Sequence, residues 1–437
     1  MNLKQKKIAF ISLGCDKNRV DLEEMMHNLS AYGFSFTNSQ NAQIVIVNTC
    51  AFILSARQEA IENILEMAQL KKSGNLEKII VTGCLCQRYK EELEKYLPEV
   101  DRFVEIKDNN KIVNIIGELY GENVKYTYEK KQFLIAPKHY AYLKIADGCN
   151  NACAYCTIPK IRGRYFSIPM EDVISRAKQL VSSGASEIIV VAQDVTRYGT
   201  DLYKQPKLIE LLKELVKIKN LKWIRLHYCY PELVTQELLT FMEENPKICP
   251  YLDIPLQHID NKILKDMNRR NTEDECRNLI SYIQNNHPNF AIRSTFIVGF
   301  PGETHSQFKK LCKFLKQAKL QNVGFFAYSK EESTKAFYMK KQVPKFIKNW
   351  RLKQVQKIQS KIAMDINLSQ IGTTHEVLID SFDSSLGYFE ARTSKMSPNV
   401  DFCVKIPCSE NVEIGKFYKV RFVGFENYYF IGELAEE

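Results

Sequence analysis

Residues 140–156 read YAYLKIADGCNNACAYC, an apolar strand-like run that leads into three closely spaced cysteines. Gaps of three and two residues separate Cys149, Cys153 and Cys156, so a single loop can wrap them around one metal centre. With 13 cysteines in 437 residues, this spacing is expected by chance only about 0.01 times in such a chain. The sequence therefore predicts a metal-binding loop at the end of a strand.

Three thiolates are one fewer than an iron–sulfur cluster normally takes, so one iron stays open. An open iron can bind a cofactor directly, as the open position of a catalytic zinc binds water. S-adenosylmethionine suits it, because its amine and carboxylate chelate the iron and bring its sulfonium close to the cluster. One electron passed to that sulfonium breaks a carbon–sulfur bond and leaves a 5′-deoxyadenosyl radical. A zinc site is the alternative for the same three cysteines.

A second set of cysteines stands in the first part of the chain. Cys15, Cys50 and Cys84 each follow a run rich in β-branched residues, at 8–12, 44–47 and 79–81. Helical patterns follow at 20–32, 55–69 and 91–97, so the strands are expected to form a parallel sheet. The three cysteines would then meet at the sheet edge where α/β folds bind ligands, provided that the strands are neighbours. We expect Cys86, two residues past Cys84, to point elsewhere.

The rest of the chain divides into three further segments. Strand-like runs at 142–146, 188–192, 223–226, 252–254, 294–298 and 323–327 alternate with helices at 170–183, 208–218, 235–244, 273–286 and 306–316. This pattern predicts a partial or complete α/β barrel, with a doubly wound sheet as the alternative. A basic helical stretch follows at 345–369, and then five short runs at 376–379, 388–391, 403–406, 418–423 and 428–432 predict a small OB-like barrel. We therefore expect an α/β protein with segments at 1–131, 137–343, 344–370 and 371–437.

Composition places limits on the class of protein. Hydrophobic residues make up 45% and charged residues 26%, which is typical of a globular chain with a large core. No run is long enough to span a bilayer, and the apolar run at 8–13 is too short for a signal peptide. We therefore expect a cytoplasmic protein that does not associate with membranes. Disulfides are rare in the cytosol, so cysteines outside the two sets are expected to be small buried residues: Cys229, Cys249, Cys276, Cys312, Cys403 and Cys408.

At this point a resemblance is plain. The loop with Cys149, Cys153 and Cys156 and the barrel around it resemble the radical S-adenosylmethionine superfamily, and the whole chain resembles its methylthiotransferase branch. The resemblance implies two [4Fe-4S] clusters, the second held by Cys15, Cys50 and Cys84 and carrying sulfur. It also implies S-adenosylmethionine as cofactor, an electron donor such as flavodoxin or ferredoxin, and a C-terminal TRAM-like barrel for docking the substrate.

Further residues near the predicted strand ends resemble the cofactor-contacting positions of that superfamily. They are Gln193, Asp194, Gln257, His258, Arg293, Gly299, Pro301, Gly302 and Glu303. A tight turn at 299–302 and a structural role for His258 are the alternatives. The segment 161–168 resembles the basic stretch after the cluster loop, although Ile168 stands where the family usually has an arginine.

Two branches of the family differ in substrate. Residues 12–18, 192–199 and 251–258 resemble the RimO-type branch, which methylthiolates the β-carbon of an aspartate in the twelfth small-subunit ribosomal protein. Residues 371–437 carry a net charge of −5, which would attract a basic ribosomal protein and repel a transfer-RNA backbone. We therefore expect contact with nucleic acid only through the ribosome. The alternatives are a transfer-RNA adenosine methylthiotransferase and a non-enzymatic iron–sulfur carrier.

Overall fold

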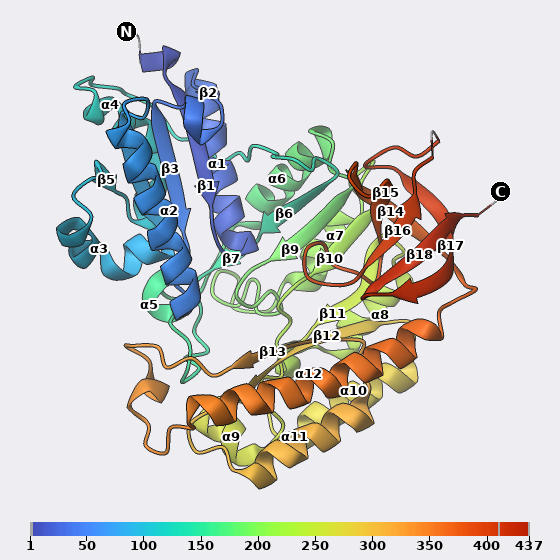
Figure 1. Cartoon of the computed structure of the whole chain (residues 1–437). Coiled ribbons are helices and arrows are strands. Elements are labelled where there is room, and N and C mark those ends of the chain that lie inside the picture. The colour runs from blue at the N-terminus through green and yellow to red at the C-terminus, as the bar shows by residue number, and fades with distance from the viewer. Residues whose placement is uncertain (1–2, 410, 436–437) are drawn as a thin grey trace. The chain divides into compact units, whose positions relative to one another are not determined.

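The computed structural model describes residues 3–409 and 411–435 and contains two open sheets and a closed barrel (Figure 1). The chain forms two compact units, and it passes from one to the other several times near the cysteine loop. The first unit holds the chain up to Ile135, together with Tyr142–Asn150 and Cys156–Ser183. The second holds Ala136–Ala141, Asn151–Tyr155 and the chain from Gly184 on. In the described part of the chain, no helix combines the length and apolarity needed to cross a membrane.

The first unit is built on a five-stranded parallel sheet in the order β2-β1-β3-β4-β5. Its strands are β1 (Lys7–Ser12), β2 (Ser35–Phe36), β3 (Ile44–Thr49), β4 (Lys78–Gly83) and β5 (Arg102–Phe103). Its helices are α1 (Asp16–Tyr32), α2 (Leu54–Lys72), α3 (Cys84–Tyr96) and α4 (Ile112–Leu119), and α5 (Ile158–Arg162) and α6 (Met170–Ser182) also belong to this unit. Every residue of β3 is buried, because helices cover both faces of the sheet.

The alternation of β3 side chains assigns each face of this sheet to different helices. Val45 and Val47 pack with apolar side chains of α2 and α3. Ile44 and Ile46 pack on the other face with side chains of α1 and α4. The predicted parallel sheet is thus confirmed, and β1, β3 and β4 are direct neighbours as the convergence of the cysteines requires.

The helix predicted at 91–97 is the second part of α3, which begins at Cys84 and is kinked at Tyr89 (φ −137°, ψ 29°). Gly83 has φ +93° and turns the chain directly from β4 into this helix, so no loop separates the two elements. The two-residue strands β2 and β5 were also missed, since they are too short to leave an alternating pattern.

The second unit contains most of a six-stranded sheet in the order β13-β12-β11-β10-β9-β6. The strands are β6 (Tyr140–Lys144), β9 (Glu187–Val191), β10 (Trp223–Leu226), β11 (Ile248–Asp253), β12 (Ala291–Val298) and β13 (Asn322–Ala327). The helices that follow are α7 (Leu208–Leu215), α8 (Gln236–Glu244), α9 (Asn261–Asp266), α10 (Glu273–Asn286) and α11 (His305–Ala318). The strands follow one another in chain order and the sheet stays open, which confirms the partial barrel and excludes the doubly wound alternative.

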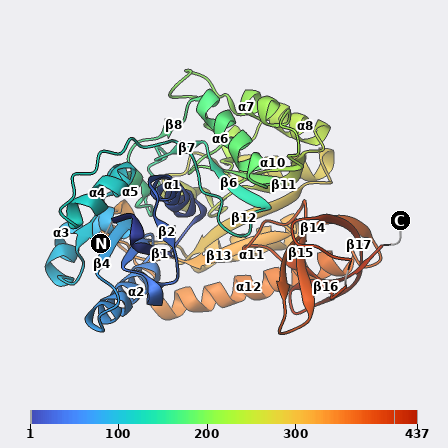
Figure 2. The ribbon, with the colours of Figure 1, turned by 90° about the horizontal axis from the view of Figure 1, so that it is seen from above.

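The C-terminal part is a long helix followed by a closed five-stranded barrel. Helix α12 (Lys345–Leu368) packs against β13 and α11 (Figures 1 and 2). The barrel runs β14-β15-β16-β18-β17, with β16 and β18 parallel. Its strands are β14 (Thr374–Asp383), β15 (Tyr388–Thr393), β16 (Cys403–Pro407), β17 (Phe417–Glu426) and β18 (Tyr429–Leu434). All five predicted strands are therefore confirmed, each with longer bounds.

The barrel packs on the sheet of the second unit through one apolar cluster and one buried ionic network. Trp223 of β10 meets Phe417 of β17 edge-to-face at 4.9 Å between ring centroids. Beside them, Arg392 of β15 pairs with Glu187 of β9 at 2.6 Å and with Asp380 of β14 at 2.5 Å. Arg392 and Glu187 are buried, so water does not reach their charges. Breaking the network would leave a buried charge without a partner, and the network therefore fixes the barrel against the sheet.

The short remaining elements complete the fold. They are strands β7 (Ala146–Asp147) and β8 (Phe166–Ser167), which pair with each other, and 3-10 helices Leu3–Gln5, Ser39–Asn41, Ile106–Lys111, Pro231–Leu233 and Lys335–Tyr338.

Candidate functional site

The first three cysteines lie at one edge of the five-stranded sheet. Cys15 follows β1, Cys50 follows β3, and Cys84 begins α3 directly after β4. A Cβ atom added at Gly14 would lie 2.7 Å from the Cβ of Cys50, which shows how closely the first two loops approach. The thiols of Cys15 and Cys50 also lie near enough to Cys84 for their charge to raise its pKa. The structure therefore brings the three predicted residues together.

Glycines make this convergence possible. Gly14 and Gly83, each one residue before a cysteine, have φ values of +98° and +93°. A Cβ at Gly83 would lie 2.4 Å from the Thr49 carbonyl oxygen, so no other residue fits between the ends of β3 and β4. The small residues before the cysteines thus have a physical role: they let the three loops touch.

Asn18, in the first turn of α1, ties the loops to one another. Its side-chain amide donates to the carbonyl oxygens of Leu13 (3.0 Å) and Thr49 (2.8 Å). Its side-chain oxygen accepts from the Cys84 thiol at 3.5 Å. One buried amide therefore connects the segments that carry all three cysteines.

A buried arginine completes this side of the site. Arg162, at the end of α5, donates from one nitrogen to Asp21 (2.5 Å) and Asp147 (3.2 Å). From another nitrogen it donates to Asn18 (2.5 Å) and to the sulfur of Cys84 (3.7 Å). Lys144 pairs with the same two aspartates, at 2.5 Å and 3.5 Å, so two cations and two carboxylates balance inside the unit.

Burial controls the state of these thiols. It raises the pKa of Cys84 to about 12, although the Arg162 charge pulls in the other direction. Burial likewise raises the pKa of Cys50. Both thiols are neutral at pH 7 and become ligands only when a metal displaces their protons. Cys86 lies in the hydrophobic core, where burial raises its pKa to about 12.

The loop that begins at Cys149 is held against the segment 163–164 of the same unit. Gly148 has φ +71°, and a Cβ there would lie 2.2 Å from the Arg164 carbonyl oxygen. The Cys149 backbone N–H donates to the Gly163 carbonyl at 3.2 Å. The Ile158 backbone N–H donates to the sulfur of Cys156 at 3.4 Å, an orientation that favours a thiolate.

Cys153 belongs to the second unit and has cationic and aromatic neighbours there. Its sulfur lies 4.0 Å from the Arg269 guanidinium and 4.0 Å from the Tyr230 hydroxyl. Arg269 also stacks on the Tyr230 ring at 4.5 Å and donates to the Pro255 carbonyl oxygen. A charged donor beside a buried sulfur suits a negatively charged cluster ligand.

In neither set do the three thiols point at a common centre. Among the residues described, no three His, Cys, Asp or Glu side chains already lie close enough together to hold a metal ion. The donor chemistry nevertheless fits an iron–sulfur cluster: three thiols per set, glycines that permit close approach, and a buried arginine beside one sulfur of each set.

The polar residues predicted after the second barrel strand are Gln193 and Asp194, and Asp194 is hydrogen-bonded within the second unit. The buried carboxylate of Asp194 accepts from Thr196 (2.6 Å), Arg197 (3.2 Å) and Asn151 (3.3 Å). Asn151 lies in the cysteine loop between Cys149 and Cys153, so Asp194 holds this loop in position. Gln193 precedes it and is half-buried.

The turn at 299–303 is organised by its own glutamate. The Glu303 carboxylate accepts the backbone N–H groups of Gly299 and Phe300 and pairs with Arg351 of α12 at 3.3 Å. Gly299 and Gly302 have φ values of +74° and +83°, and Pro301 is buried between them. Glu303 therefore shapes the turn, and the Gly302 N–H donates to the Lys341 carbonyl oxygen at 2.9 Å.

The remaining predicted positions occupy three settings. His258 is fully buried and its Nδ1 accepts the Asp260 backbone N–H at 3.0 Å. Gln257 has φ +69° and bridges to Phe296 of β12. Arg293 pairs with Asp253 at 3.2 Å and with Asp401 of the barrel at 3.6 Å, so it already has two carboxylate partners.

Sequence reasoning missed Asn18, Asp21, Arg162 and Arg269 as parts of these sites. Asn18 and Arg162 stand inside segments that were noted for their resemblance, but their contacts are long-range: 144 residues separate the two. No spacing rule links such a pair before the fold is known.

Comparison with known proteins agrees with this architecture. Residues 143–315 match the Radical SAM superfamily, residues 371–435 match the TRAM domain, and residues 7–105 match the uncharacterized protein family UPF0004. The ribosomal protein uS12 methylthiotransferase RimO of Clostridium botulinum strain Eklund 17B is 42% identical, over 99% of this chain and 98% of its own length. The RimO proteins of Thermoanaerobacter sp. X514 and Clostridioides difficile 630 are also 42% identical over nearly their full lengths.

The chain belongs to the RimO family of radical S-adenosylmethionine methylthiotransferases.

Solved structures support the fold of this RimO family member. The radical S-adenosylmethionine methyltransferase TsrM from Kitasatospora setae, with cobalamin and a [4Fe-4S] cluster bound, superposes with a TM-score of 0.55 over 74% of this chain and 75% of its own. The cobalamin-dependent enzyme OxsB gives a TM-score of 0.52 over 82% of this chain and 56% of its own. At 13% and 11% identity, these likenesses concern the fold alone.

Proposed function

We propose that this protein adds a methylthio group to the β-carbon of an aspartate in ribosomal protein uS12. Full-length identity of about 40% to proteins named for that activity carries the proposal. The cysteines after β1, β3 and β4 and the three cysteines of the 149–156 loop support it, since the reaction needs one site for radical formation and another for sulfur.

In this proposal Cys149, Cys153 and Cys156 hold a [4Fe-4S] cluster that binds S-adenosylmethionine, and Cys15, Cys50 and Cys84 hold a second. When bound, the clusters supply the electron that splits the cofactor and a place for sulfur. An external one-electron donor, such as flavodoxin or ferredoxin, completes the cycle.

The chain's own residues bind and orient the cofactor. The backbone of Gly299, Pro301 and Gly302 gives it close access, and Gln193 supplies a polar contact. Asp194, Gln257, His258, Glu303 and Arg293 act by fixing the loops around it, through the contacts described above. Arg269 and Arg162 place positive charge beside one sulfur of each set.

The substrate assignment is tested by mass spectrometry of uS12 from cells with and without the gene. We expect the methylthio mass increment on one uS12 aspartate only when the gene is present. An unmodified uS12 in both strains, with a methylthio-adenosine lost from transfer RNA in the deletion strain, would refute the substrate.

The roles of the two sets are tested by single cysteine variants. Cys50→Ala should lose about half of the cluster iron yet still cleave S-adenosylmethionine, because the other set is intact. Cys153→Ala should lose cleavage. Cys86→Ala is the control, since its thiol lies in the core, and it should keep full iron content. Cleavage that persists in Cys153→Ala would contradict the assignment.

A further inference from the structure

The positive charge of the chain is concentrated in one segment. Residues 305–361 contain fourteen lysines and Arg351 but only two acidic residues, Glu331 and Glu332, a net charge of +13. The whole chain carries +10, so everything outside this segment is net negative. A charge so localised concerns one surface and not solubility in general.

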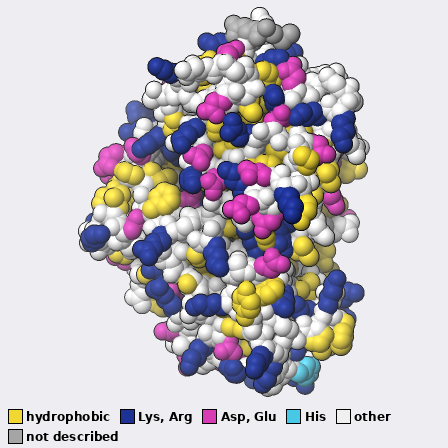
Figure 3. Space-filling view, turned by 90° about the vertical axis from the view of Figure 1, so that its left-hand side faces the viewer, with side chains coloured by type: hydrophobic (Ala, Val, Ile, Leu, Met, Phe, Trp, Pro, Cys, Tyr) yellow, Lys and Arg dark blue, Asp and Glu magenta, His cyan; other side chains and the backbone are white. Residues whose placement is uncertain are grey.

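The segment contains α11, β13, a 3-10 helix and most of α12, and the two α-helices lie side by side in the second unit. Helices α11 and α12 are adjacent in both ribbon views (Figures 1 and 2), and Trp350 of α12 packs on Phe308 of α11 at 5.7 Å. Dark-blue Lys and Arg side chains are scattered over the whole face drawn in Figure 3, its lower end included. Twelve of the lysines are exposed: Lys309, Lys313, Lys316, Lys319, Lys330, Lys335, Lys340, Lys341, Lys345, Lys353, Lys357 and Lys361.

Protein carboxylates leave this charge uncompensated. Lys310 pairs with Asp260 and Glu273, and Arg351 pairs with Glu303. Within the described residues, the other thirteen cations of the segment form no ion pair with a carboxylate. Lys353, Lys357 and Lys361 repeat every four residues on α12, a spacing at which like charges destabilise a helix. An external polyanion would relieve this repulsion.

Aromatic side chains are interleaved with the lysines. Phe346, Trp350 and Tyr338 are 73%, 46% and 77% exposed. The opposite side of α12 is already used, because Val355, Ile362 and Ala363 are buried. Exposed rings among lysines suit stacked bases and phosphates. Binding to a membrane surface would require a continuous exposed apolar face, but the apolar side chains of α12 are buried against the rest of the protein.

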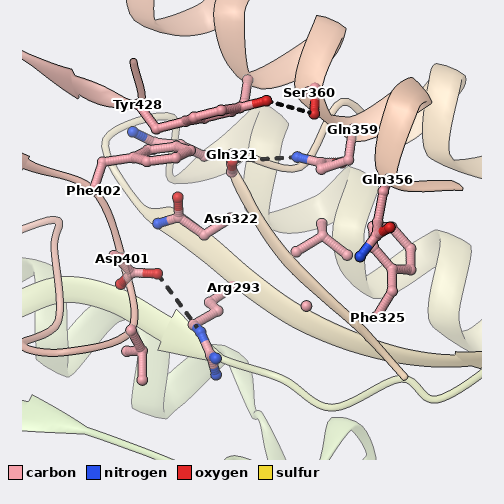
Figure 4. A pocket seen from close by; sticks show the side chains of 14 residues that line it. Arg293, Gln321, Asn322, Phe325, Gln356, Gln359, Ser360, Asp401, Phe402 and Tyr428 are labelled. Atoms are coloured by element: carbon pink, nitrogen blue, oxygen red, sulfur yellow. Dashed lines mark hydrogen bonds and ion pairs between the residues drawn. The ribbon is translucent and has the colours of Figure 1, made fainter. Parts of the chain in front are cut away.

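A cavity lies beside α12, on the side of the barrel (Figure 4). It encloses about 300 Å³ between α12, β13 and the barrel. Gln356 and Ser360 of α12 line it, next in sequence to Lys357 and Lys361. On the barrel side, Tyr428 stacks on Phe402 with 5.9 Å between ring centroids and donates to Ser360 at 3.1 Å. The amides of Gln321 and Asn322 complete a lining with flat rings and paired donors and acceptors, the groups that recognise a nucleobase.

We propose that this surface is an RNA-binding site, with phosphates along Lys353, Lys357 and Lys361 and a base in the cavity beside Tyr428. The RNA is single-stranded or looped, because a base must leave its stack to enter a cavity. The inference rests on the proposed function only for the source of that RNA, which would be the ribosomal RNA that accompanies a ribosomal protein substrate. The basic helices and the edge of the barrel at Tyr428 then contact RNA, and the rest of the acidic barrel is left for protein.

The test measures binding of the full-length protein to a short fluorescein-labelled single-stranded RNA by anisotropy at several KCl concentrations. The triple variant Lys353→Gln, Lys357→Gln, Lys361→Gln should reduce the slope of log Kd against log salt by about 2, since three phosphate contacts are lost. The matched control replaces three exposed lysines elsewhere in the unit, Lys204, Lys213 and Lys219, by Gln and should keep the wild-type slope. Tyr428→Ala should weaken binding about fivefold or more and leave the slope unchanged.

Two results would overturn the proposal. One is an unchanged slope in the α12 triple variant. The other is equal affinity of the wild-type protein for a polyaspartate peptide or for anionic vesicles, which would identify an acidic protein or a membrane as the partner. The assay contains neither uS12 nor S-adenosylmethionine, so a failure of the methylthiolation assignment leaves its outcome intact.

Discussion

At the scale of single residues, the site depends on contacts that only a particular backbone permits. Gly83 is the sharpest case, because its positive φ and its close approach to the Thr49 carbonyl exclude a Cβ atom on two separate grounds. Gly74, in the loop after α2, has a similar φ of +102° but no atom within 4 Å of the place where its Cβ would stand. The two glycines therefore separate the cost of the backbone conformation from the cost of the clash.

This difference leads to a prediction on stability and iron content. Gly74→Ala should destabilise the protein by about 1 kcal/mol, the conformational term alone. Gly83→Ala should add about 1–3 kcal/mol from overpacking and should push the ends of β3 and β4 apart. Urea unfolding followed by circular dichroism, together with the iron content after reconstitution, measures both effects. Equal losses in the two variants, with full iron in each, would show that the close approach of the loops does not matter.

Residue types could be predicted from the sequence further than residue contacts could. The six cysteines and the small residues before three of them stand at recognisable offsets from strand-like runs. Arg162 and Asn18 could not be assigned in this way, because a guanidinium that serves a sulfur 78 positions away in the chain leaves no local signal. The family resemblance rests on segments that contain Asn18 and Arg162, but it does not say that their side chains contact each other.

At the scale of elements, the strands were predicted well because each is an apolar run bounded by turn residues. The first part of α3, from Cys84 to the kink at Tyr89, was not predicted, since Gly83 leads directly from β4 into it. The packing of the barrel on the sheet could not be predicted from the sequence pattern either. It depends on charged side chains from β9, β14 and β15, which are far apart in the sequence and meet only in the folded chain.

The stability of this contact between barrel and sheet should depend on pH in a defined direction. Burial by itself would raise the pKa of Asp380, but Arg392 and the hydrogen bond with His139 outweigh it and hold the pKa below its usual value. The same balance, with Arg392 and Arg225, lowers the pKa of Glu187. A carboxylate with a lowered folded-state pKa stabilises the protein above its unfolded pKa, about 4, and this contribution is lost as the pH falls through the folded-state value.

Asp380→Asn should therefore destabilise the second unit at pH 7, by about 3 kcal/mol as for other broken buried pairs, and its difference from the wild type should narrow as the pH falls below about 4. Both tryptophans, Trp223 and Trp350, lie in this unit, and Trp223 contacts the barrel. Fluorescence-detected urea unfolding in a Trp350→Phe background therefore reports the junction directly. Glu376→Gln, exposed on the same strand, is the control and should follow the wild-type pH profile. A destabilisation that stays constant from pH 7 to pH 3 would contradict the argument.

At the scale of the whole molecule, the compact units differ from contiguous stretches of sequence. The first unit takes in Tyr142–Asn150 and Cys156–Ser183 besides its N-terminal sheet. These later segments supply the partners of buried charges on α1: Lys144 and Arg162 for Asp21, and Arg176 for Glu24 at 2.5 Å. The unit is thus completed by the chain that carries the cysteine loop, which links the folding of the two cysteine-bearing segments.

Truncation tests this completion. A fragment of residues 1–183 contains every segment of the first unit, whereas residues 1–135 lack Lys144 and Arg162, the two cations of Asp21, and the segments that pack beside them. Because it loses these ion pairs together with the packing of the later segments, the shorter fragment should lose much of its folding free energy. We expect a cooperative urea transition by circular dichroism for 1–183 and none, or one at much lower urea, for 1–135. If 1–135 unfolds at the same urea concentration as 1–183, the later segments only rest on a sheet that is stable alone, and the two cysteine sets fold independently.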